Sequence, residues 1–198
     1  MNMRNINLRY VDEKFDENGL LTDYKLKWPE NFNFGYDVVD DIAVNDPDRR
    51  AMVWCNPQGE ERIYTFADMK RLSDKTANYF MSLGIKKGDK VLVILKRHYQ
   101  FWYVITALHK IGAIIVPATF MLTKMDIEYR VNSASIKAAI CTDENGVPEA
   151  VDSAEDIPSL EIKMIVNHPA RDGDSSTRRW NRLRRSWRDR KPRLPSPC

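Results

Sequence analysis

Two short polar stretches hold the side chains of this sequence that are best placed for ligand chemistry. Arg97 and His98 directly follow a continuous aliphatic run, the pattern of a strand buried on both faces. Thr119 and Met121 follow a second apolar run. Because α/β sheets bind ligands at the carboxyl ends of their strands, we expect all four residues at one sheet edge. Two interpretations stay open: contact with a ligand, or a solvated loop arginine and ordinary loop packing.

Other residues that could suggest chemistry are expected to be structural. Lys87-Gly88-Asp89 precedes a strand, whereas a phosphate-binding loop follows a strand and opens a helix, so we expect a turn. His109 stands within a helical pattern and is expected at the surface. Cys141 ends an apolar run and is expected in the core.

Alternating helix and strand patterns must position these residues. The expected order is helix 65–83, strand 91–95, helix 100–111, strand 114–116, helix 123–132, strand 137–141 and, after a loop, strand 161–166. Short connections between these elements indicate a parallel sheet flanked by helices, with the first three strands adjacent. Upstream, 34–44 has a helical stripe, and 51–55 with 62–64 reads as a β-hairpin around a turn-rich tetrad. The fold class is α/β.

Composition limits the class of protein. The chain has 198 residues, 43% hydrophobic and 30% charged, which is typical of a soluble globular protein with one ordinary domain. The sequence contains no run of 18 apolar residues, so it predicts no membrane-spanning helix. The polar N-terminus lacks the apolar centre of a secretory signal, and three cysteines without metal-ligand spacing suggest a reducing compartment. We therefore expect a cytoplasmic protein.

The charge pattern divides the chain into three expected segments. Residues 1–27 are charged and expected to be irregular, and residues 28–167 form the α/β domain. Residues 168–198 carry 10 Lys and Arg against 3 Asp and Glu, with nine Arg and one Lys, and periodicity is lost. We interpret this tail as frameshifted or disordered. The alternative is a basic amphipathic segment for nucleic acid or a membrane, on which Trp180, Leu183 and Trp187 have helical spacing.

Four motifs in sequence order resemble one known family. They are Tyr64-Thr65-Phe66 with Asp68-Met69, Leu83-Gly84-Ile85 with Lys87-Gly88-Asp89, Ala107-Leu108-His109-Lys110-Ile111-Gly112-Ala113 with Val116-Pro117, and Pro117-Ala118-Thr119 with Met121-Leu122. Together they resemble the N-terminal portion of AMP-forming acyl-CoA synthetases, members of the adenylate-forming superfamily. The last motif, with Asp126-Ile127 and Tyr129-Arg130, is similar to medium-chain and branched-chain acyl-CoA synthetases. The resemblance covers about 28–166.

The resemblance implies a ligase of fatty acid metabolism that uses ATP, Mg²⁺ and coenzyme A to activate a carboxylic acid. It also implies that Arg97, Thr119 and Met121 lie near the coenzyme A channel. The chemistry needs a Ser/Thr/Gly-rich phosphate loop and a lysine, and the sequence offers only Asp174-Ser175-Ser176-Thr177, with no Gly-x-Pro-Lys after it. We therefore assign no catalytic residue and no metal ligand, and expect no cofactor for this chain alone.

Three functions remain open on the sequence. The first is an N-terminal, truncated portion of an acyl-CoA synthetase that is inactive alone. The second is a non-catalytic binding protein that uses the basic tail on nucleic acid, which we consider the weaker case, or on a membrane. The third is one half of a split synthetase that a complementing C-terminal chain would complete.

Overall fold

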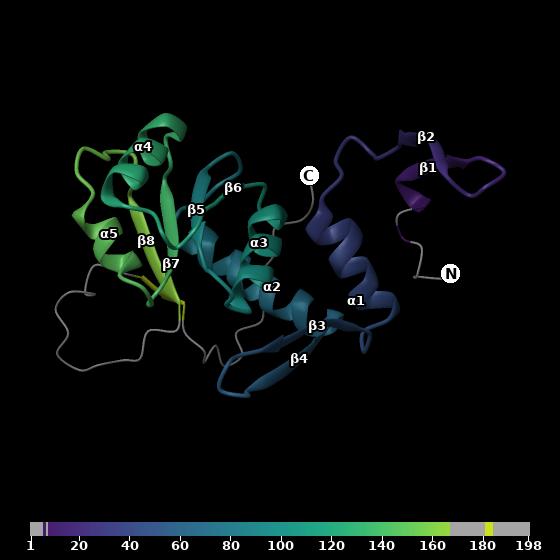
Figure 1. Cartoon of the computed structure of the whole chain (residues 1–198), viewed down its shortest axis with the longest axis horizontal. Coiled ribbons are helices and arrows are strands. Elements are labelled where there is room, and N and C mark those ends of the chain that lie inside the picture. Colours follow the sequence, from purple (N-terminus) through teal and green to yellow (C-terminus); the bar gives the residue numbers. More distant parts are fainter. Residues whose placement is uncertain (1–5, 7, 167–180, 184–198) are drawn as a thin grey trace. The chain divides into compact units, whose positions relative to one another are not determined.

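A computed structural model describes residue 6, residues 8–166 and residues 181–183. It divides into two compact units, residues 1–70 and 71–198 (Figure 1). The predicted frameshifted or disordered tail, and the helical spacing within it, lie outside the described residues except at 181–183. Among the residues that are described, no helix combines the length and apolar character needed to cross a membrane.

The first unit contains two hairpins and a short helical segment. Strands β1 (Val11–Phe15) and β2 (Leu21–Leu26) pair antiparallel, as do β3 (Arg50–Cys55) and β4 (Glu61–Thr65). Between them a π-helical stretch (Phe34–Asp40) runs into α1 (Asp41–Asn45). The predicted helix at 34–44 and the predicted hairpin at 51–64 are therefore confirmed.

The prediction that residues 1–27 are irregular is wrong, because β1 and β2 form a hairpin there. Its turn has identifiable chemistry. The Asp16 carboxylate accepts hydrogen bonds from the backbone N–H groups of Asn18 and Leu20, at 2.9 and 2.8 Å. Gly19 has φ +76°, a conformation that glycine adopts without steric cost. Asn18-Gly19 is a turn signal that the charged composition obscured.

The second unit is built on one parallel sheet. Its strands are β5 (Lys90–Ile94), β6 (Ile114–Pro117), β7 (Ala138–Thr142), β8 (Ile162–Val166) and β9 (Asn181–Leu183), in the order β6-β5-β7-β8-β9. All neighbouring pairs run parallel. The predicted adjacency of the first three strands is confirmed. The short strand β9 falls within the segment predicted to lack regular structure, so the prediction differs from the structure there.

Alternating side chains of the strands build two cores. Val91, Val93 and Leu95 face the layer that includes the later turns of α2 (Phe66–Ser82) and α3 (Gln100–Lys110). Leu92 and Ile94 face the layer of α4 (Lys124–Ala134) and α5 (Val147–Ser153). These residues are at most 1% exposed, as expected for a sheet covered on both sides. In Figure 1, α4 and α5 lie on one side of the sheet and α3 on the other.

Helix α5 occupies part of the loop that the sequence pattern predicted between the last two strands. It has only seven residues, and Pro148 stands in its first turn, where a proline costs little because that N–H has no helical partner. A helix of this length gives too little periodicity to be recognised from sequence.

Candidate functional site at the carboxyl edge of the sheet

The sheet has a point at which the direction of the chain path reverses. From β5 the chain moves to β6 on one side, and then to β7 on the opposite side of β5. The loop after β5 leads to α3 in one layer, and the loop after β7 leads to α5 in the other. The loops at the carboxyl ends of β5 and β7 therefore diverge, which is the place where open α/β sheets bind ligands.

The loop after β5 contains Lys96, Arg97 and His98. Lys96 has φ +40°, an uncommon value for a residue with a side chain, and Lys96 and Arg97 are exposed. The His98 side chain is only 10% exposed, and its backbone N–H donates to Leu95 O at 3.0 Å. Arg97 thus lies at the predicted edge with its side chain accessible.

The loop after β6 contains the other two predicted site residues. Thr119 is exposed, and its Oγ1 accepts a hydrogen bond from the Met121 N–H at 3.3 Å. The Met121 side chain is 72% exposed. Lys96 Nζ lies 4.6 Å from the ring centroid of Phe120, so the loops after β5 and β6 are in contact. The structure therefore places Arg97, Thr119 and Met121 on two touching loops of one edge.

Helix α4 fixes the end of the second loop through a capping box. Thr123 Oγ1 accepts from the Asp126 N–H at 3.3 Å, and the Asp126 carboxylate accepts from the Thr123 N–H at 3.0 Å. The pKa of Asp126 is lowered, first by the Thr123 backbone N–H and then by its hydroxyl. The start of α4 is thereby fixed two residues after Met121.

The loop after β7 adds residues that the sequence analysis missed. Thr142 is buried, and its Oγ1 lies 2.6 Å from His98 Nε2 and accepts from the Glu144 N–H at 3.2 Å. One Glu144 carboxylate oxygen lies 3.8 Å from His98 Nε2, and the other lies 3.8 Å from Lys96 Nζ. Asp143 completes the group. Thr142 ends the buried strand β7, and Asp143 and Glu144 directly follow it, so polar residues at the end of a buried strand were the signal that could have found them.

The opposite, amino edge of the sheet is fixed by a different network. Lys137 Nζ lies 2.8 Å from the Asp89 carboxylate and 2.9 Å from Gly84 O. Burial alone would raise the pKa of Asp89, but hydrogen bonds from Lys137 and from the Lys86 N–H outweigh it and the pKa is lowered. The hydrogen bond to Asp89 raises the pKa of Lys137.

The turn at Lys87-Gly88-Asp89 is confirmed as a structural turn. Gly88 has φ +85°, and its N–H donates to Gly112 O at 2.9 Å. Gly112 has φ +69° just after α3, and a Cβ there would stand 2.9 Å from the Lys87 side chain. Both glycines are therefore required by backbone conformation, and neither forms a phosphate loop.

Two single-residue predictions have different outcomes. Cys141 is fully buried, as predicted, and burial raises its pKa well above the ordinary thiol range. The prediction that His109 is a surface residue is wrong. His109 is half-buried in α3, and burial lowers its pKa. The helix pattern gave its position along α3, but packing against neighbouring elements decided its exposure.

The chain is thus a parallel α/β protein whose loops after β5, β6 and β7 gather at the carboxyl edge of the sheet, where proteins of this class bind ligands. Comparison with known proteins then identifies the family. Residues 39–197 match the family described as AMP-binding enzyme, and the chain belongs to this family. The match continues past residue 167, so the boundary at 167 and the frameshift interpretation stay predictions.

Curated relatives are acyl-coenzyme A synthetases. The chain is 35% identical over 152 residues to acyl-coenzyme A synthetase ACSM4, mitochondrial, of Rattus norvegicus, covering 73% of this chain and 26% of that protein. It is 35% identical over 158 residues to acyl-coenzyme A synthetase ACSM3, mitochondrial, of Homo sapiens, covering 76% and 27%. The chain thus spans about a quarter of the length of these relatives.

A solved structure supports the fold. The Mycobacterium tuberculosis fatty acyl CoA synthetase superimposes with a TM-score of 0.60 over 67% of this chain and 26% of that chain, at 22% sequence identity. The α/β prediction and the resemblance to the synthetase family are confirmed.

Proposed function

We propose that this chain forms the N-terminal part of an AMP-forming acyl-CoA synthetase that acts on a medium-chain or branched-chain carboxylic acid. The observation that carries the proposal is the family match over residues 39–197, joined to 35% identity with acyl-coenzyme A synthetases. The part of a synthetase that this chain supplies is the parallel sheet with its carboxyl-edge loops.

Coenzyme A is the ligand that we assign to the loops after β5 and β6. Three features support this assignment. Arg97 is an exposed guanidinium, whose fixed fork of donors suits phosphate. Thr119 and Met121 are exposed on the neighbouring loop, and the Lys96–Phe120 contact joins the two loops. We propose that Arg97 binds a phosphate of coenzyme A and that Met121 contacts an apolar part of it.

We assign no step of adenylate formation to this polypeptide. The family uses ATP and Mg²⁺, yet the 198 residues contain no Gly-x-Pro-Lys loop, and backbone N–H cradles of that kind supply most of the stabilisation of phosphoryl charge. We therefore propose that the polypeptide alone is inactive and that the missing parts come from further sequence or from a complementing chain.

ATP–pyrophosphate exchange tests this division of labour. The purified 198-residue polypeptide should give no acid-dependent exchange with butyrate, hexanoate or 2-methylbutyrate. Adding a separate chain that carries the phosphate loop and the C-terminal portion of a relative should restore exchange if the split arrangement works. Acid-dependent exchange by the polypeptide alone would contradict the proposed inactivity, because it would require a phosphate cradle within these residues.

The cytoplasmic location remains our proposal, supported by three cysteines without metal-ligand spacing, which suit a reducing compartment. The names of the relatives describe those proteins as mitochondrial. Fractionation of cells that express the chain with a C-terminal tag distinguishes the two locations. Recovery of the tag in the mitochondrial fraction would contradict the proposal.

A further inference from the structure

His98, Asp143 and Glu144 form a cluster of metal-binding side chains at the carboxyl edge. One imidazole nitrogen and one oxygen from each carboxylate all lie within 4.8 Å of one another. His98 comes from the loop after β5, whereas Asp143 and Glu144 come from the loop after β7. The cluster therefore joins two loops that are far apart in sequence.

The position of the cluster is a second and independent indication of a ligand. The loops after β5 and β7 are the two that diverge toward opposite layers of helices, and open α/β sheets bind ligands between such loops. The donors thus lie at the ligand-binding point of the topology, which was identified from strand order without reference to side chains.

The donor set suits a divalent transition metal. Zn²⁺ binds imidazole and carboxylate donors at about 2.0–2.2 Å in a tetrahedral arrangement, so two donors on one ion stand about 3.4 Å apart. The donor atoms lie within 4.8 Å of one another, which is wider than that spacing, and Glu144 is exposed, so its side chain has room to rotate toward the other two donors. A nitrogen donor favours this class over Mg²⁺ or Ca²⁺, which prefer all-oxygen sites.

Thr142 shares the imidazole nitrogen Nε2 that a metal ion would use. Its Oγ1 already accepts from the Glu144 N–H, so its own proton can be donated to His98 Nε2, 2.6 Å away. In that arrangement Nδ1 holds the proton and the lone pair of Nε2 accepts from Thr142, so an ion on Nε2 has to displace that hydrogen bond. A bound ion replaces the hydroxyl proton as the partner of Nε2.

One neighbouring charge opposes metal binding. Lys96 Nζ lies 3.8 Å from the Glu144 carboxylate, and a like charge this close weakens the hold on a cation. Lys96 is exposed, and its ammonium group also lies over the Phe120 ring. Because its side chain is exposed, we expect the loop to keep its fold when Lys96 is replaced. Removing this charge should therefore strengthen metal binding.

We propose that His98, Asp143 and Glu144 form a binding site for one divalent transition-metal ion of the Zn²⁺ class. Three protein ligands leave coordination positions for water or for an anionic group. The ion ties the loop after β5 to the loop after β7. This site is separate from adenylate formation and does not depend on the proposed function.

Titration of the whole 198-residue chain with Co²⁺ tests the site, because visible absorption of Co²⁺ reports its ligands. The variants are His98→Gln, Glu144→Gln and Lys96→Gln, with Glu149→Gln as the control, since Glu149 is an exposed carboxylate on α5 outside the cluster. We expect one ion per chain, binding weakened at least about tenfold by His98→Gln and by Glu144→Gln, unchanged binding in Glu149→Gln, and tighter binding in Lys96→Gln.

The outcomes separate metal binding from a purely structural histidine–glutamate contact. Far-ultraviolet circular dichroism first shows that each variant folds, and Glu144→Gln keeps the test valid if His98→Gln does not fold. The proposal is overturned if Glu144→Gln binds like Glu149→Gln, or if Lys96→Gln fails to tighten binding. An intense near-ultraviolet thiolate band would also overturn it, because the ion would then sit on a cysteine.

Discussion

The two edges of the sheet both carry charged side chains, but they hold them in different ways. At the amino edge, Lys137 contacts Asp89 at 2.8 Å and Gly84 O at 2.9 Å. At the carboxyl edge, His98 and Lys96 stand 3.8 Å from Glu144, and Lys96, Arg97 and Glu144 are exposed. Short ion pairs between chain segments fix a fold, whereas accessible charges on diverging loops are available to ligands.

This difference predicts where substitutions affect stability and where they affect binding. The amino end of the layer also contains the buried pair of Lys110, at the end of α3, and Asp74 in α2. Changes on that side should lower the free energy of unfolding. Changes at exposed residues of the carboxyl edge should leave stability nearly unchanged and alter binding.

The largest expected effect comes from Lys110→Met. Lys110 Nζ lies 2.5 Å from Asp74 Oδ1, and the Lys110 side chain is fully buried. Lys110→Met breaks this buried ion pair, and breaking a buried pair by removing one partner typically costs about 3–5 kcal/mol of unfolding free energy. Urea unfolding of the wild type and of Lys110→Met measures this loss of unfolding free energy.

The double variant Lys110→Met/Asp74→Leu is the matched control. It removes both charges, so it should recover a large part of the loss. If the double variant is no more stable than Lys110→Met, the ion pair is not the source of the effect, and the packing of α2 against α3 must be.

The second effect is a pH dependence at the amino edge. The lowered pKa of Asp89 means that its contribution to stability is present above the ordinary aspartate pKa of about 3.9 and is lost as the pH falls through the folded-state value. The unfolding free energy should therefore decline in acid, and Asp89→Asn should show a smaller decline. Glu149→Gln, on the exposed side of α5, serves as the control. An Asp89→Asn profile that parallels the wild type would refute the assignment.

A smaller effect is expected at the cap of α4. Thr123→Ala removes the hydroxyl that accepts from the Asp126 N–H, and loss of such a cap typically costs about 1 kcal/mol. Thr123→Ser keeps the hydroxyl and should restore most of the stability in thermal unfolding. Equal stability of the alanine and serine variants would show that the cap contributes little here.

The smallest effect on stability is expected at the proposed coenzyme A loops. Arg97→Ala and Met121→Ala change exposed side chains and should alter the free energy of unfolding by no more than about 0.5 kcal/mol. In a longer synthetase that contains this segment, the same changes should raise the KM for coenzyme A and leave that for ATP unchanged. A loss of stability comparable to that of Thr123→Ala would contradict the comparison between the edges.

Strong periodicity made the fold of the second unit predictable. Strand β5 and helix α3 have long apolar patterns, and the predicted bounds differ from the observed ones by one residue. Short elements escaped prediction because seven residues in α5 and five in β1 give too few repeats against a polar background. The missed hairpin in the first unit depends on the Asp16–Gly19 turn rather than on apolar alternation.

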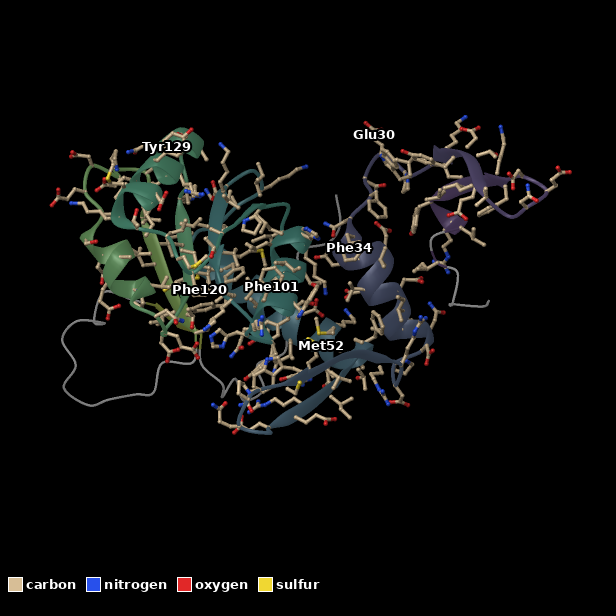
Figure 2. All side chains as sticks on the ribbon, in the orientation of Figure 1. Glu30, Phe34, Met52, Phe101, Phe120 and Tyr129 are labelled. Carbon is tan, nitrogen blue, oxygen red and sulfur yellow. The ribbon has the colours of Figure 1, made fainter. Side chains whose placement is uncertain are left out.

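The sequence predicted the sheet edge at which the candidate site lies, but it did not predict all the residues that meet there. Residues that follow apolar strand patterns led to Arg97, Thr119 and Met121, and the structure places them on one edge. The partners of His98 depend on which strand lies beside β5, a long-range relation that local patterns do not encode. Exposure was also unpredictable. Tyr129 belongs to a segment that resembles the synthetase family, yet its side chain is 71% exposed. Figure 2 shows it on the outer side of α4.

A segment exchange tests the central claim most directly. Residues 39–166 would replace the matching segment of rat acyl-coenzyme A synthetase ACSM4, and thioester formation from hexanoate, ATP and coenzyme A would be measured. If this chain supplies the N-terminal layer of such an enzyme, the chimera should form the thioester, and Arg97→Ala in the chimera should raise the KM for coenzyme A. A chimera that is soluble, folded and able to form the adenylate, yet shows no response to Arg97→Ala, would contradict the role given to the carboxyl edge. A folded chimera that forms neither adenylate nor thioester would contradict the proposed function itself.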